Sequence, residues 1–175
     1  MRGRRAERRR RSFFRRVADA RGAAMVEFAL VAPLLFVVIF GTIDFGRAFH
    51  YWNLEQQMAN EGARLAAVNS GVPGKCADGT SPTTLQQYIQ CQNTGEVASG
   101  GSFWFDKGAK VCISFPSGTS NIGDPVQVQV SASYKWLPID WYFSSSPPTT
   151  TTIAGTATMR LEAAPFKYSS GCYQP

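Results

Sequence analysis

The sequence predicts an α+β protein, in which a long N-terminal transmembrane helix continues into a small disulfide-bonded domain whose antiparallel sheet packs on the C-terminal half of that helix. Three observations predict this class. A basic N-terminus precedes an apolar run of membrane length, helical periodicity continues beyond that run, and strictly alternating segments with four cysteines follow. The expected divisions are a basic leader at 1–22, the helix at 23–70 and the outer domain at 71–175.

The apolar run is long enough to cross a bilayer. Phe28 to Ile43 holds 16 residues without a charge, and counting from Ala23 gives 21 residues interrupted by Glu27. At about 1.5 Å per residue such a helix spans roughly 31 Å, the thickness of the hydrocarbon core. A carboxylate at this depth needs a neutralising partner. A cut after Gly22 would supply one, because the new α-amino group at Ala23 would lie one turn from Glu27.

The basic leader accounts for the positive net charge. Its first 21 residues hold ten arginines against Glu7 and Asp19, so the rest of the chain carries a formal charge of −2. We interpret this flank as topogenic, holding itself on the cytoplasmic side, rather than as a nucleic-acid or anionic-lipid patch, and we expect no nucleic acid among the partners. A secretory signal peptide fits less well, since the apolar run is too long and Asp44 and Arg47 follow it.

Several motifs from Arg21 to Ala67 together resemble a known family. A glycine after a basic leader, with a glutamate five residues later, resembles the processing site of type IV-like prepilins. The strings GAAMVEFALVAPLL, GTIDFGRAF and QQMANEGARLAA are similar to the TadE-like proteins, which are minor pilins or pseudopilins of tight-adherence (Flp-type) pilus systems. The resemblance covers the helix well and the remaining chain mainly in its order of helix and then strands.

The resemblance implies a role in pilus assembly, initiation or adhesion, with prepilin peptidase cleaving between Gly22 and Ala23. Glu27 would be the assembly carboxylate. The expected partners are the peptidase, other minor and major pilins, the inner-membrane assembly platform and the lipid bilayer. The N-terminus would be cytoplasmic and the C-terminal domain extracytoplasmic, in the inner membrane or in an extracellular pilus. The alternative is an uncleaved single-pass protein with an outward ligand- or surface-binding domain.

The helix is expected to bend at Pro33 and to continue to about Asn69, ending at Ser70-Gly71. Aromatic residues at 49, 51 and 52 would lie where the chain leaves the membrane, and His50 is interpreted as an interfacial residue. The i,i+3 pairs Asp44 with Arg47 and Glu61 with Arg64 are interpreted as solvated helix charges.

Beyond the helix, alternation predicts three strands with one wet face. They cover Ala109 to Phe115, Val126 to Trp136 and Ile153 to Leu161. A short helix is expected from a Ser81-Pro82 cap to about Cys91. A loop or helical turn is expected over 137–146, with its aromatic residues Trp141, Tyr142 and Phe143 over a sheet edge.

The four cysteines all follow the membrane helix, so an oxidising compartment and two disulfides are expected. Three connectivities are possible. We favour Cys76 with Cys91, which bracket the short helix, and Cys112 with Cys172, which would tie the tail to a strand. Zinc is disfavoured because the chain has no C-x-x-C pair.

No motif for catalysis, a cofactor or a metal is present in the sequence. One histidine has no partner at a useful spacing, and neither a phosphate loop nor a nucleophile elbow occurs. Asp106, Asp124 and Asp140 are interpreted as solvated turn residues rather than a calcium site or an acid/base pair. The sequence therefore predicts a structural protein and not an enzyme.

Overall fold

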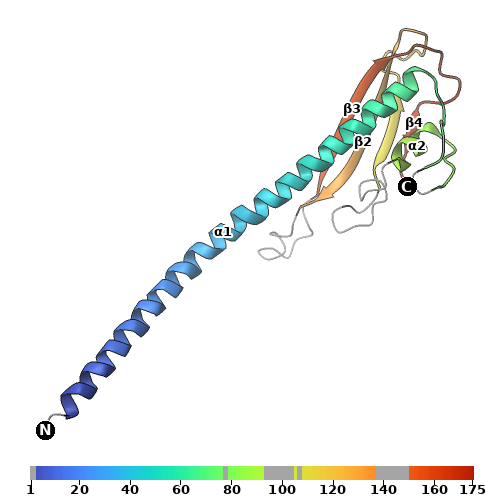
Figure 1. The fold of residues 1–175 in the computed structure, drawn as a ribbon. Helices are drawn as coiled ribbons and strands as arrows, with labels where there is room; N and C mark the ends of the chain where they lie inside the picture. The colour runs from blue at the N-terminus through green and yellow to red at the C-terminus, as the bar shows by residue number, and fades with distance from the viewer. Residues whose placement is uncertain (1–2, 77–78, 93–104, 106–107, 137–149) are drawn as a thin grey trace. The chain divides into compact units, whose positions relative to one another are not determined.

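A computed structural model gives the fold (Figure 1). It describes residues 3–76, 79–92, 105, 108–136 and 150–175, with side chains described from residue 22 onward. The loop expected at 137–146, with Trp141, Tyr142 and Phe143, lies outside the described residues, as do Asp106 and Asp140. The chain forms two compact units, residues 1–43 and 44–175, and each is described by itself.

One helix, α1 (Gly3–Ala67), contains 65 residues and supplies both the N-terminal unit and the first element of the C-terminal unit. It continues past the apolar run as predicted and also extends back through the basic leader. Pro33 lies inside α1 without ending it. Whether Pro33 bends the helix in a bilayer stays a prediction.

The end of α1 is set by Asn69 and not by Gly71. Asn69 adopts a left-handed φ of 51°, its N–H donates to Ala66 O at 3.0 Å, and the N–H of Ser70 donates to Leu65 O at 3.0 Å. This pair of bonds closes the helix in a Schellman arrangement, with asparagine at the left-handed position. The Asn69 side chain also accepts from the Lys167 N–H at 3.1 Å, so the helix end is joined to the C-terminal segment.

The sheet is antiparallel, as predicted, and has four strands in the order β3-β2-β1-β4. Its strands are β1 (Lys110–Ser114), β2 (Pro125–Lys135), β3 (Thr150–Arg160) and β4 (Gly171–Tyr173). The three alternating segments form β1, β2 and β3, whereas β4 was not predicted. β4 pairs with β1 so that Cys172 lies opposite Cys112, and these two cysteines form a disulfide.

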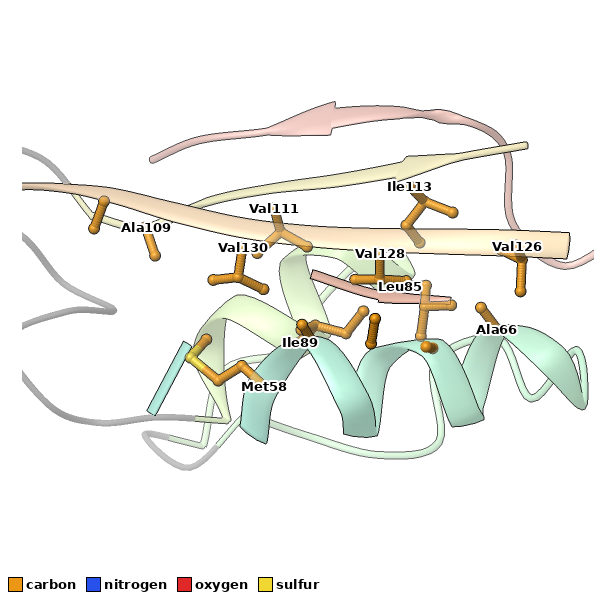
Figure 2. Packing of buried hydrophobic residues seen from close by; sticks show 14 of the residues in the cluster. Met58, Ala66, Leu85, Ile89, Ala109, Val111, Ile113, Val126, Val128 and Val130 are labelled. Carbon is orange, nitrogen blue, oxygen red and sulfur yellow. The ribbon is translucent and has the colours of Figure 1, made fainter. Parts of the chain in front are cut away.

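The core lies between α1 and the dry face of the sheet, as expected. Figure 2 shows side chains of β1 and β2 directed toward α1, with Leu85 and Ile89 of the short helix α2 (Leu85–Cys91) completing the layer. The helix contributes mainly small residues, and the cluster includes Met58, Ala59, Ala63, Ala66, Val111, Ile113, Val126, Val128 and Val130.

The start of α2 differs from the prediction. Thr84, and not Ser81, is the N-cap, because its backbone is extended and its hydroxyl accepts the Gln87 N–H at 3.2 Å. The Gln87 side chain in return accepts the Thr83 N–H at 2.9 Å, so the two ends of this first turn bond each other. A disulfide joins Cys76 to Cys91 across this helix. Both disulfides are the pairs favoured from the sequence.

Two glycines allow α1 to approach its neighbours closely. A Cβ at Gly155 of β3 would lie 2.4 to 2.5 Å from backbone atoms of Glu55 and Gln56. A Cβ at Gly62 of α1 would lie 2.7 Å from Ile89 Cδ1, which is a side-chain end and can move. Gly155 therefore fixes the distance between helix and sheet, since neither backbone can give way.

We expect Gly155→Ala to destabilise the C-terminal unit by about 1 to 3 kcal/mol, the usual cost of forcing extra volume into a packed interface. Gly74→Ala is the matched control, because a Cβ there meets no atom within 4 Å. Denaturant unfolding of the full chain in detergent, followed by aromatic fluorescence, measures both. Equal midpoints for the two variants would contradict the assigned packing.

Candidate functional site

The N-terminal unit presents an apolar helix surface with no protein cover among the described residues. From Met25 to Ile43 its large side chains are exposed, including Phe28, Leu30, Leu34, Phe36, Phe40 and Ile43. An exposed apolar surface of this extent marks a membrane or protein interaction site. The described part of the chain holds one helix, within Gly22–Ala67, that is long and apolar enough to cross a membrane. This marks a single-pass membrane protein.

The predicted processing residues lie at the start of this surface. Gly22 has open space around it, since an added Cβ would meet nothing within 4 Å. Ala23 and Glu27 are exposed and lie on α1 at an i,i+4 spacing, which places both on one face of the helix. The helix therefore brings the expected new N-terminus and the carboxylate to the same side.

Asp44 is not a solvated helix charge, and that interpretation was wrong. Its side chain is 6% exposed, and its Oδ1 accepts a hydrogen bond from Tyr134 Oη at 2.5 Å. Burial, followed by this bond and the Asp44 charge, raises the pKa of Tyr134 far above its ordinary value, so the phenol remains a donor. The first residue of the C-terminal unit is thereby bonded to the far end of β2.

The expected cluster of interfacial aromatics divides into two sets. Tyr51 packs into the domain, with its ring 4.8 Å from Phe105 and 5.8 Å from Tyr134. Phe49 and Trp52 instead remain exposed, and their ring centroids lie 5.7 Å apart. His50 is exposed beside Tyr51, in keeping with an interfacial position. Of the three expected interfacial aromatics, Phe49 and Trp52 are therefore the two whose rings can contact the membrane surface or another protein.

Glu55 was missed by the sequence analysis, and it is the most unusual polar group in the domain. Its side chain is fully buried, and neither carboxyl oxygen makes a hydrogen bond within the described part of the chain. Burial raises its pKa to about 9, and the nearby Ala132 N–H opposes this shift only in part. A polar residue in a helix with many polar neighbours gave no indication of burial. Glu55 therefore stands in the helix–sheet interface as a neutral acid at pH 7.

Among the residues that the structure describes, the remaining candidate sites show no catalytic arrangement. A cavity of about 450 Å³ between α1 and α2 has Glu61 and Arg64 among otherwise apolar and amide side chains such as Leu54, Met58 and Tyr88. Within the described residues, no group of three or more His, Cys, Asp or Glu side chains could hold a metal ion. Asp124 accepts from Thr119 Oγ1 at 2.6 Å and from the Asn121 N–H at 2.9 Å, as expected of a turn residue, and these bonds lower its pKa.

The pKa of Glu55 predicts an unusual pH dependence of stability. Because the folded-state value, about 9, lies above the ordinary 4.5, the stabilising effect of the proton is complete below pH 4.5 and is lost as the pH rises toward 9. Between pH 4.5 and 7 the loss is about 3 kcal/mol at roughly 1.4 kcal/mol per pH unit. We expect Glu55→Met to remove this slope.

Denaturant unfolding of the full chain between pH 4.5 and 9 measures the effect. Glu61→Met is the matched control, because Glu61 is exposed on the same helix and should leave the slope unchanged. If wild type and Glu55→Met change in parallel over this range, Glu55 is not a buried neutral acid.

Comparison with known proteins agrees with these features. A family model described as TadE-like protein matches residues 22–64, from the glycine at the start of the exposed apolar helix to the alanine-rich stripe beneath the sheet. Neither a curated protein nor a solved structure matches the chain. That family is pilus-associated and structural rather than catalytic. The chain is TadE-like over residues 22–64, and this similarity associates it with tight-adherence pilus systems.

Proposed function

We propose that this protein is a minor pilin, or pseudopilin, of a tight-adherence pilus, made as a precursor and cut after Gly22 by a prepilin peptidase. The observation that carries the proposal is the family match that begins at Gly22 and continues through the whole apolar helix. The two disulfides and the sheet support an extracytoplasmic position for residues 44–175, because disulfides persist in oxidising compartments.

Charge supports the orientation. The ten arginines before Gly22 would hold the leader in the cytoplasm, where a prepilin peptidase could reach the open Gly22 junction. Cleavage would remove the leader and leave the apolar helix attached to the mature protein. A secretory signal peptidase would have the opposite effect, because it would separate the helix from the outer domain.

Glu27 would then serve assembly. In the bilayer, the α-amino group of Ala23 one turn away would neutralise its carboxylate, within one chain or between neighbouring subunits. In a pilus, the exposed apolar side chains from Phe28 to Ile43 would exchange lipid for the helices of other pilins. Pro33, which lacks a backbone donor, would loosen one turn and ease this transfer. The inner-membrane assembly platform would perform the extraction.

The first test asks where the mature chain begins. Co-expression with a prepilin peptidase, followed by intact-mass measurement of membrane-extracted protein, should give a chain starting at Ala23. Gly22→Lys should leave full-length precursor in the membrane, because a long charged side chain replaces the open junction. Gly3→Lys, the same change within the leader, should be cut normally. A wild-type chain that still starts at Met1 would favour the uncleaved single-pass alternative.

The second test asks whether the charge of Glu27 acts in assembly. We expect Glu27→Gln to be cleaved at the wild-type rate, yet to enter sheared pili at least tenfold less often, because a neutral amide cannot pair with the α-amino group. Glu61→Gln, an exposed change on the same helix, should enter normally. Quantitative immunoblotting of pilus and membrane fractions measures both. Normal entry of Glu27→Gln would exclude the pairing.

A further inference from the structure

The strand β3 is the longer of the two edges of the sheet. All 11 of its residues pair with β2 on one side, and within the described residues no backbone hydrogen bond joins its other side to another segment. The opposite edge, β4, has three residues and is held to β1 by the Cys112–Cys172 disulfide. An unpaired edge carries backbone donors and acceptors that can bind another strand.

The outward-facing backbone groups of β3 can be identified from its last bonds. Leu161, directly after β3, donates its N–H to Asp124 O at 2.8 Å and accepts the Gly123 N–H at 2.7 Å, so both of its backbone groups face the β2 side. In an antiparallel strand these directions alternate from residue to residue. The even-numbered residues Thr152, Ala154, Thr156 and Thr158 therefore present their N–H and C=O groups at the open edge.

This edge lacks the features that usually prevent strand pairing. Natural edge strands often contain a lysine, a proline or a β-bulge, or they are very short. From Thr150 to Met159, β3 has no charge and no proline, and its register with β2 is continuous. Arg160 is the first charged residue, and its Nε donates to Gly123 O at 3.1 Å within the same hairpin. A strand that paired with Thr150 to Met159 would meet no charged side chain of this segment and no proline that lacks a backbone N–H.

The flank of α1 above this edge carries two exposed aromatic rings, those of Phe49 and Trp52, beside the amide side chains of Gln56 and Asn60. α2 contacts β1 and β4, whereas α1 contacts β3 at Gly155, so the two helices cover different halves of the dry face (Figure 1). The α2 side of α1 carries Leu54 and Met58. Phe49 and Trp52, on the opposite flank at about 100° per residue, are 51% and 41% exposed. A strand added to β3 would place alternate side chains against these rings.

We propose that the open edge of β3 binds an extended segment of a different protein, which adds a fifth strand to the sheet. The segment would be uncharged, with apolar side chains at alternate positions directed toward Phe49 and Trp52. The inference stands on the geometry of the outer domain and does not depend on cleavage after Gly22. The hydrophobic core does not require this edge of β3 to be unpaired, and the proposal gives the unpaired edge a role in binding.

Antiparallel pairing with β3 of a second copy is disfavoured by the direction of α1. Along α1, Asp44 bonds Tyr134, whose strand partner is Thr151, and Ala67 O accepts the Glu162 N–H at 2.8 Å, so α1 runs parallel to β3. An antiparallel pair of β3 strands would direct the two α1 helices in opposite directions. Two chains anchored in one membrane cannot adopt that arrangement, and parallel pairing is the weaker alternative.

Residue-resolved hydrogen–deuterium exchange on the full chain in lipid nanodiscs tests the proposal. In the chain alone, the amides of the even-numbered residues should exchange at least a hundredfold faster than those of Ile153 and Ala157. The probe is a synthetic peptide with the sequence of residues 126–134, VQVQVSASY. This uncharged, alternating segment belongs to β2, which pairs with the other edge of β3. Adding it should protect the even-numbered amides.

Thr156→Pro should weaken peptide binding at least tenfold, since it removes an outward N–H while leaving the amides that pair with β2. Thr156→Val, which keeps the N–H, should bind like wild type, and protected Ile153 and Ala157 amides in both variants show that the sheet is intact. Protection of the even-numbered amides without peptide would overturn the proposal: if independent of concentration, the chain covers its own edge, and if dependent, a second copy does. Peptide binding that ignores Thr156→Pro would also overturn it.

Discussion

The structure depends on how closely α1 can lie on the sheet. At Gly155 the helix backbone occupies the space that any side chain would need, and this contact is possible because β3 has a glycine there and α1 presents alanine at 59, 63 and 66. Close approach lets a helix with few large side chains bury Val126, Val128 and Val130 completely. Up to Ile43 the same helix is suited to a different environment, because its large apolar side chains are exposed on every side.

The change from one environment to the other falls at Asp44. It is the first residue of the C-terminal unit, and Tyr134 supplies the hydroxyl that makes its burial possible. Glu55, three turns later, is also buried on the sheet side, but no hydroxyl group of the described residues bonds its carboxyl oxygens. Protonation of Glu55 therefore removes the negative charge that burial would otherwise make costly. Buried polar groups that are unmatched in this way are costly. The domain tolerates one such group at the contact that holds α1 against the sheet.

Much of the architecture could be predicted because its patterns are long. Apolar alternation over 126–136 identifies a strand whichever fold contains it, and an uncharged run after ten arginines identifies a membrane helix. The short or contextual features could not be predicted. β4 has three residues without alternation and depends on pairing with β1, while the left-handed Asn69 that ends the helix is also held by a hydrogen bond from the distant Lys167. Asp44 and Glu55 have charges typical of a solvated helix, and only the close approach of the sheet buries them.

A single helix serves as membrane anchor up to Ile43 and as a core element of the outer domain from Asp44. Site-directed spin labelling at successive positions from 28 to 67 in lipid nanodiscs, with oxygen and a water-soluble nickel complex as relaxants, tests this division of the helix. We expect high oxygen accessibility on all faces up to residue 43, then a 3.6-residue periodicity with the sheet-facing positions protected from both relaxants. Nickel accessibility on one face throughout 28–43, or no periodicity beyond 44, would contradict it.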